Sequence, residues 1–237
     1  MHLSKEFTKG LIHGIPIALG YISVSFGFGI IAVKNGISPF QASLISALNL
    51  TSAGQAAGVD VIASKGSLIE MALVQLTINI RYSLMALSLS QKLDKSFTAR
   101  HRLLASYGIT DEIFAVSSSQ EELITPVYMY GMILIATLGW VGGTVMGSVA
   151  GNLLPASISN AMGVVLYAMF LAIIVPPSRK HRNVLMVVSA AAVISTLLRY
   201  TAKGLSSGFA VIISSVIASL AGALLFPVKD SEEVAEP

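Results

Sequence analysis

Long apolar stretches separated by short polar gaps run through most of the chain. About 20 predominantly apolar residues of helix are needed to cross the hydrocarbon core of a bilayer. Stretches of about this length predict full spans at residues 11–33, 67–91, 127–151, 157–175, 184–200 and 208–226. We therefore expect an all-α fold, a polytopic membrane helix bundle with about six full spans. Residues 1–237 are expected to form a single transmembrane domain, with a short tail from about residue 228.

Two further stretches are apolar but interrupted by small and polar residues. Residues 39–63 contain the run from Asn49 to Gln55, and residues 103–125 contain Asp111, Glu112 and three serines at 117–119. At membrane depth, backbone that is not helical is tolerated only where protein buries it or where it lines a water-filled cavity. The two interrupted stretches are therefore expected to be broken or re-entrant segments, and they are where a transport pathway is expected.

Basic residues gather in three places between the apolar stretches. These are the N-terminus, the loop after residue 91 and the loop after residue 178, with Lys5, Lys9, Lys92, Lys95, Arg100, Arg102, Arg179, Lys180 and Arg182. Cytoplasmic loops of membrane proteins are enriched in Lys and Arg, so we expect all three places, and both chain termini, in the cytoplasm. Residues 39–63 must then enter and leave on the outer side, and residues 103–125 on the inner side.

The composition supports a membrane protein and argues against other classes. Of the residues, 54% are hydrophobic and 11% are charged, whereas a soluble domain carries about 25% charged residues. The mean hydropathy is +0.77. The formal net charge of +3 comes from basic residues spread through loops, so no nucleic-acid partner is expected. Cysteine is absent, and no His/Asp/Glu cluster or Ser/His/Asp set has the spacing of a metal or catalytic site. We expect no metal, no cofactor and no enzymatic activity.

Small and polar residues, among them Ser52, Gly54 and Gln55, lie in the middle of residues 39–63. Such residues let the backbone turn and expose its N–H and C=O groups. Half-helix ends built this way bind a carboxylate at the positive end and a cation or ammonium at carbonyls, and an amino-acid zwitterion needs both. The alternative is a packing face of Gly54 and Gly58, with Gln55 bonded to a neighbouring helix.

Polar side chains emerge on two sides of the helix predicted at residues 67–91. At about 100° per residue, one face carries Glu70, Thr77 and Arg81, and nearly the opposite face carries Gln75, Asn79 and Tyr82. A helix with polar groups on both sides is expected to lie inside the bundle rather than against lipid.

Arg81 is expected about 21 Å along this helix from Ser67, at a rise of about 1.5 Å per residue. An arginine at such a depth costs at least about 2.5 kcal/mol unless it is paired. The candidate partners are Asp111 and Glu112, with Asp60 a poorer one. Two interpretations follow: a gate or substrate contact, or a structural role as an ion pair or as a side chain that reaches the cytoplasmic headgroups.

The triplet Thr110-Asp111-Glu112 has the pattern of a helix start, with Thr110 as the N-cap and acidic residues in the first turn. Because the triplet lies in a segment that enters the membrane, the alternative is a carboxylate that is protonated during transport.

Glycine recurs every four residues along the stretch 127–151, at Gly139, Gly143, Gly147 and Gly151. Such a stripe allows very close approach of another helix, inside the bundle or from a partner subunit. Nearby, Trp140 and Tyr128 are interpreted as packing or interface aromatics. His13 is expected to bond a local backbone group at a break in the first helix.

Taken together, these elements resemble the AzlC-like branched-chain amino-acid permeases, the large subunits of azaleucine-resistance exporters. The resemblance runs from about residue 10 to residue 226. It is carried by a glycine- and proline-broken first helix (Gly14, Pro16, Gly20, Gly27) and by the elements Ala53-Gly54-Gln55, Asn79-Ile80-Arg81-Tyr82 and Thr110-Asp111-Glu112. In two departures, Gln55 follows Gly54 directly where the family usually inserts two small residues, and Tyr82 stands where the family often has His. They bear on the substrate, not on the fold.

The resemblance implies a secondary transporter, a multi-pass permease that exports branched-chain amino acids or analogues across the inner (cytoplasmic) membrane of a bacterium. It also implies a small AzlD-like membrane subunit as partner, for which the glycine stripe at 139–151 is a reasonable docking face. The expected substrate-binding or gating residues are Ser52, Gly54, Gln55, Gln75, Asn79, Arg81, Tyr82, Asp111 and Glu112. The alternative function is a passive channel or a membrane scaffold for another small solute.

Overall fold

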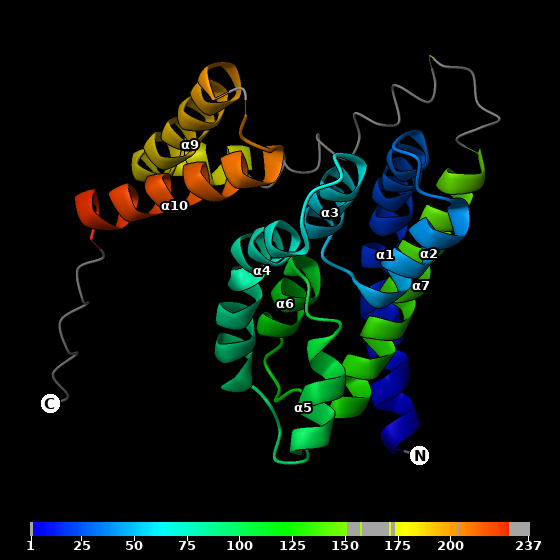
Figure 1. Cartoon of the computed structure of the whole chain (residues 1–237). Coiled ribbons are helices and arrows are strands. Elements are labelled where there is room, and N and C mark those ends of the chain that lie inside the picture. The colour runs from blue at the N-terminus through cyan, green and yellow to red at the C-terminus, as the bar shows by residue number, and fades with distance from the viewer. Residues whose placement is uncertain (1, 151–156, 158–170, 172–173, 203, 228–237) are drawn as a thin grey trace, which may run out of the picture. The chain divides into compact units, whose positions relative to one another are not determined.

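The computed structural model describes residues 2–150, 157, 171, 174–202 and 204–227, and the regular secondary structure in those ranges is helical (Figure 1). The chain divides into two compact units, Met1–Met169 and Phe170–Pro237. The first holds α1 (His2–Lys34), α2 (Pro39–Leu48), α3 (Ala53–Ala63), α4 (Leu68–Ser90), α5 (Ala99–Ser106), α6 (Asp111–Ser118) and α7 (Pro126–Ala150). The second holds α9 (Arg182–Thr201) and α10 (Ser207–Leu225). The all-α fold class is confirmed.

Five helical segments are long and apolar enough to cross a membrane. They are Lys5–Lys34, Leu68–Ser90, Pro126–Ala150, Arg182–Thr201 and Gly208–Leu225. These correspond to five of the six predicted spans. The sixth, at residues 157–175, lies almost wholly outside the described residues, as does the tail from residue 228.

The core of the first unit is formed by α1 and α7, which lie side by side and run in the same direction (Figure 1). Glycines of α7 bring the two backbones into contact. A Cβ atom on Gly139 would lie 2.6 Å from the carbonyl oxygen of Ala18, and one on Gly143 would lie 2.5 Å from that of Ile22. Gly147 meets the α1 backbone in the same way. The glycine stripe is therefore a packing face inside the chain.

This packing corrects the expectation that the stripe docks a partner subunit. Between residues 139 and 147 the face is already covered by α1, because backbone-to-backbone contact leaves no room for a second helix. Gly151 lies outside the described residues.

The sequence predicted a break in the first helix, and this prediction is wrong. Helix α1 runs without interruption through Pro16. Proline removes one backbone hydrogen bond and crowds the preceding turn, but contact with α7 holds α1 on both sides of it. His13, which was expected to bond a local backbone group, contacts a side chain: its Nδ1 atom lies 2.8 Å from the hydroxyl of Tyr128, and the two rings meet edge to face. The histidine thus joins α1 to α7.

Residues 39–63 form a helical hairpin of α2 and α3, separated by a non-helical segment at residues 49–52. The chain enters α2 through a capping box of Ser38 and Gln41. On the return, Gln55 Nε2 donates to Ser46 Oγ at 3.0 Å, and Val59 packs in a core cluster shared with the start of α2. The segment therefore begins and ends at the same end of the unit, as predicted.

Residues 99–118 form a second hairpin of α5 and α6, interrupted at residues 107–110. Thr110 caps α6, since its Oγ1 accepts the backbone N–H of Ile113 at 3.3 Å, which confirms the predicted N-cap. At the far end of α6, Lys92 Nζ donates to the carbonyl of Ser118 at 2.5 Å. Because Lys92 precedes α5, this hairpin also begins and ends at one end of the unit.

The two hairpins enter the unit from opposite ends. The first starts beside the C-terminal end of α1, where Ala32 packs with α2 and α3. The second ends beside the starts of α1 and α7, where Lys9 and Glu122 form an ion pair at 2.9 Å. The tips meet between these ends, since the Tyr107 hydroxyl donates to the carbonyl of Ala47 at 2.6 Å.

Helix α4 packs against α3 and α6 with its polar residues. Large apolar side chains on its other side are exposed within the described part of the chain, namely Ile69, Leu73, Leu76, Ile80, Leu84 and Leu87. We expected both sides of this helix to be covered, and the described residues cover one of them.

In the second unit, α9 and α10 form an antiparallel pair. Gly222, near the end of α10, packs against Val187, near the start of α9. Ser206 caps α10 by accepting the backbone N–H of Phe209 at 3.4 Å.

Candidate functional site

The candidate site begins at the interruption of the first hairpin. Ser52 has φ 49°, in the left-handed region that residues other than glycine rarely adopt. It occupies the N-cap position of α3, yet its side chain makes no capping hydrogen bond. The Oγ of Ser52 and the Oγ1 of Thr51 are buried and have no hydrogen-bond partner among the described residues. Buried hydroxyls are nearly always bonded, so these two oxygens are suited to a bound solute.

Gly54, in the first turn of α3, occupies a position that no side chain fits. A Cβ atom there would lie 2.8 Å from Gln75 Oε1 and 3.0 Å from Asn79 Nδ2, and closer still to Thr51. Its carbonyl accepts a hydrogen bond from Gln75 Nε2 at 2.7 Å. Gly58, one turn later, also faces the Gln75 amide. The two glycines therefore form the packing face that was one of the sequence alternatives.

Gln55 is almost fully buried, with 2% of its surface exposed. Its Oε1 accepts the indole N–H of Trp140 at 2.8 Å, and its Nε2 donates to Ser46. The amide thus ties α3 to α7 and α2. This arrangement matches the alternative in which Gln55 bonds neighbouring helices.

The side-chain amides of Gln75 and Asn79, both on α4, lie beside the non-helical segment at residues 49–52. Asn79 Nδ2 donates to Gln75 Oε1 at 2.9 Å, which orients both side chains toward the start of α3. The remaining atom, Asn79 Oδ1, is buried without a hydrogen-bond partner in the part of the chain that the structure describes. It adds an unsatisfied acceptor to the unsatisfied hydroxyls of residues 51 and 52.

Arg81 and Tyr82 connect the two hairpins. The Arg81 Nη2 atom donates to the Tyr82 hydroxyl at 3.2 Å, and its guanidinium carbon lies 5.0 Å from the centre of the Tyr82 ring. The same hydroxyl lies 3.5 Å from the carbonyl of Thr51. The helical pattern placed these two side chains on different faces, but the length of arginine lets it fold over its neighbour.

Of the two candidate partners predicted for Arg81, Asp111 forms the ion pair and Glu112 does not. Arg81 Nη1 and Asp111 Oδ2 are 2.7 Å apart, and the two side chains are 35% and 27% exposed. Asp60, the poorer candidate, is exposed on α3 and forms no ion pair among the residues that are described. The ion pair joins α4 to the first turn of α6.

Glu112 points to α1 instead. Its Oε2 lies 2.6 Å from the hydroxyl of Tyr21, and the same hydroxyl lies 2.7 Å from Thr110 Oγ1. Tyr21 is 5% exposed and stacks edge to face on Trp140. Within the described ranges Glu112 forms no ion pair. Among the described residues, the carboxyl group is therefore held by the hydroxyl of Tyr21 and is not paired with a cation.

A cavity of about 210 Å³ opens beside the start of α3. Gly54, Gln55, Gln75 and Asn49 line its polar part. The rest is apolar, with Ile45, Gly58, Val59, Ile62 and Met71. An apolar cavity next to unsatisfied polar groups is the usual form of a site for a small solute with one polar end.

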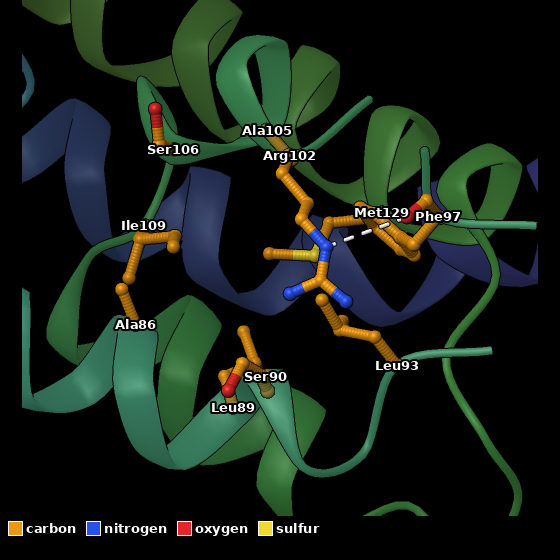
Figure 2. Close-up of a pocket in the computed structure, with 10 residues that line it drawn as sticks. All are labelled: Ala86, Leu89, Ser90, Leu93, Phe97, Arg102, Ala105, Ser106, Ile109 and Met129. Atoms are coloured by element: carbon orange, nitrogen blue, oxygen red, sulfur yellow. Dashed lines mark hydrogen bonds between the residues drawn. The ribbon is translucent and has the colours of Figure 1, made fainter. Parts of the chain in front are cut away.

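Figure 2 shows a second cavity, of about 230 Å³, between the C-terminal end of α4, α5 and α7. Arg102 reaches across it, and its Nε donates to the carbonyl of Phe97 at 3.4 Å. Its walls are mostly apolar and include Leu89, Ile109 and Met129. None of the predicted site residues lines it, so we treat it as separate from the site.

The structure thus gathers the predicted site residues around the two interruptions. Sequence reasoning missed Tyr21, Tyr107 and the bonding role of Trp140. Tyr21 lies midway along α1 and Trp140 midway along α7, at separations of 91 and 85 residues from their partners Glu112 and Gln55. A polar hydroxyl inside an otherwise apolar span is the signal that points to Tyr21. Among the described residues no group of three His, Cys, Asp or Glu could hold a metal ion.

Comparison with known proteins places these features in a family. The family model described as AzlC protein matches residues 16–154, which is more than half of the chain. The chain is 33% identical over 232 residues to an uncharacterized membrane protein of Archaeoglobus fulgidus, covering 95% of this chain and 97% of that protein. It is 30% identical over 192 residues to the inner membrane protein YgaZ of Escherichia coli, covering 76% of each. No solved structure matches. The chain therefore belongs to the AzlC family of membrane proteins.

Proposed function

We propose that this chain is the large subunit of a secondary transporter that exports branched-chain amino acids or close analogues. One observation carries the proposal. The unsatisfied buried polar atoms at the start of α3 are linked through Tyr82 and Arg81 to Asp111 at the start of α6, and the next residue, Glu112, forms no ion pair among the described residues. Both starts are interruptions of helical hairpins, the arrangement in which transporters bind their substrates near the middle of the membrane.

The polar groups are complementary to the two ends of an amino acid. The start of a helix carries a partial positive charge, and α3 has no side-chain cap, so it suits a carboxylate together with the hydroxyls of Thr51 and Ser52. The ammonium needs acceptors, which Asn79 Oδ1 and the carboxylate of Glu112 supply.

The apolar side chain of the substrate has its own place in the proposal. The cavity beside α3 is about 210 Å³, below the range of about 300–1,000 Å³ that is typical for drug-sized ligands. Its apolar walls include Ile45, Val59 and Ile62. A short branched aliphatic group buries apolar surface there without leaving a polar group unpaired.

Movement of the hairpins would open this site to one side of the membrane at a time. The ion pair of Arg81 and Asp111 links α4 to the second hairpin, and the bond from Tyr107 to Ala47 links the two tips. Both contacts have to break for a solute to pass between the interruptions, so we assign them to the gate.

We also propose a location and a partner. Basic residues of the N-terminus and of the loop after α4 lie at one end of the first unit, which supports a cytoplasmic N-terminus. The relative YgaZ is named an inner membrane protein, which supports the cell membrane as the location. A small AzlD-like membrane subunit is the proposed partner. Because α1 covers the glycine stripe, this subunit would contact another face.

The proposal is tested in cells that are loaded with leucine and challenged with a toxic leucine analogue. Cells that express the native chain with its small partner should export leucine against its gradient and resist the analogue. Arg81→Ala should abolish both, because it leaves two carboxylates without a cation. Arg100→Ala is the matched control, since Arg100 is exposed in the first turn of α5 and forms no ion pair among the described residues.

Insertion of each variant is checked from its amount in the membrane fraction. Normal resistance with a fully inserted Arg81→Ala chain would contradict the proposed site. Leucine movement that only follows its gradient would favour the passive channel, because a channel cannot accumulate a solute.

A further inference from the structure

The charges at the centre of the first unit do not balance. Arg81 is paired with Asp111 at 2.7 Å, and Glu112 is the next residue on the same helix. The start of α6 therefore carries two carboxyl groups, and the guanidinium of Arg81 pairs with one of them. An unpaired charge at membrane depth is costly, so the second carboxylate requires a proton or a cation.

The contacts identify Glu112 as the surplus carboxylate. Asp111 is held by the guanidinium, whereas Glu112 is held by the hydroxyl of Tyr21, which carries no charge. The titratable groups that interact with Glu112 are Tyr21 from α1, Tyr82 from α4 and Asp111 from its own helix, and Asp111 brings its ion-pair partner Arg81 into the set. The single cation in this set is already engaged.

The hydroxyl groups around Glu112 can serve it in both protonation states. When Glu112 is ionised, Tyr21 donates to the carboxylate and accepts from the Thr110 hydroxyl. When Glu112 is protonated, it donates to Tyr21, which then donates to Thr110. Thr110 Oγ1 also accepts the N–H of Ile113, and it retains a lone pair for the second arrangement. No bond is lost in either state.

We propose that Glu112 alternately binds a proton and the ammonium group of the substrate. This alternation couples the inward movement of protons to the export of the amino acid. This inference rests on the proposed export of amino acids. On the inner side the ammonium of the amino acid replaces the proton of Glu112, and the proton is released to the cytoplasm. On the outer side the amino acid leaves, a proton from that side binds Glu112, and the neutral site returns. One proton enters for each amino acid exported, and no bond other than O–H is formed or broken.

The test counts protons during leucine binding to the purified full-length chain. Titration calorimetry in two buffers with different ionisation enthalpies gives the number of protons released. At a pH where Glu112 is protonated, the native chain should release about one proton per bound leucine. Glu112→Gln should release none and bind leucine about tenfold more weakly, because it lacks a charged partner for the ammonium. The matched control is Glu121→Gln, the same change at an exposed position, and it should behave like the native chain.

A second variant keeps the inference testable if Glu112→Gln does not fold. Tyr21→Phe leaves the carboxyl in place but removes its hydroxyl partner. It should retain proton release and shift the pH at which release is half-maximal. Leucine binding without proton release by the native chain, or full release by Glu112→Gln, would overturn the inference while leaving the proposed function intact. If leucine does not bind the native chain at all, the proposed function itself fails.

Discussion

Removing the charge of Arg81 is expected to destabilise the protein more than removing the charge of Asp111. When Glu112 is ionised, the site holds one positive and two negative side chains. Arg81→Gln leaves Asp111 and Glu112 with no cation. Asp111→Asn leaves the guanidinium of Arg81 and the carboxylate of Glu112, so the remaining charges balance. The order of the two effects follows from the charge count alone.

The magnitude follows from the exposure of the pair. Fully exposed ion pairs contribute about 0–1 kcal/mol, and breaking a fully buried pair costs about 3–5 kcal/mol. The side chains of Arg81 and Asp111 are 35% and 27% exposed, which places this pair between the two limits. We expect Arg81→Gln to cost about 2 kcal/mol and Asp111→Asn about 1 kcal/mol. For a chain of this size, 2 kcal/mol corresponds to a fall in Tm of roughly 4–8 °C.

The assay is thermal unfolding in a mild detergent of the native chain, the two single variants and the double variant Arg81→Gln with Asp111→Asn. The double-variant cycle should give a coupling energy of about 1–2 kcal/mol. A coupling energy near zero would mean that the two side chains do not interact as observed. An equal or larger effect of Asp111→Asn would refute the charge count.

Three further substitutions test other contacts. Gly143→Ala should lower the free energy of unfolding by about 1–3 kcal/mol, because the added methyl group would meet the backbone of α1. Gly142→Ala is the control, and it should be neutral or stabilising because nothing lies within 4 Å of its added methyl group. Similar Tm values for both variants would contradict the packing of α1 on α7. Trp140→Phe should cost about 1–3 kcal/mol in unfolding free energy by leaving the buried Gln55 amide without its donor, and an unchanged Tm would argue against that bond. Tyr107→Phe should cost only about 0.5–1.5 kcal/mol but raise the rate of leucine efflux by loosening the hairpin tips, and an unaltered rate would remove Tyr107 from the gate.

The hairpins were predictable because their signal is local. The run from Asn49 to Gln55 consists mostly of small and polar residues, which interrupt the apolar stretch that a spanning helix needs, and Thr110 precedes two acidic residues as helix caps do. The structure breaks both helices at these points. The candidates for the partner of Arg81 were also predictable, since few carboxylates exist in the chain and a membrane arginine requires one, but the choice of Asp111 over Glu112 came from the structure.

Contacts between distant helices were not predictable in the same way. Periodicity identifies a glycine stripe but does not say which helix covers it, so the packing of Gly139 and Gly143 on α1 emerged only from the structure. The uninterrupted path of α1 through Pro16 also depends on a contact between distant helices, because packing against α7 outweighs the local cost of proline. The bond between Tyr21 and Glu112 joins residues 91 positions apart, a separation at which no sequence period operates.

The central claim is that the chain around Ser52 is sheltered at membrane depth in a cavity that the substrate occupies. Because the natural chain has no cysteine, single cysteines at Ser52 and, as a reference, at the exposed Asn35 can be labelled with a small water-soluble thiol reagent in intact membranes. We predict that the cysteine at position 52 reacts much more slowly than the one at position 35, and that leucine slows it further without affecting position 35. Equal labelling rates at the two positions, with and without leucine, would contradict the account.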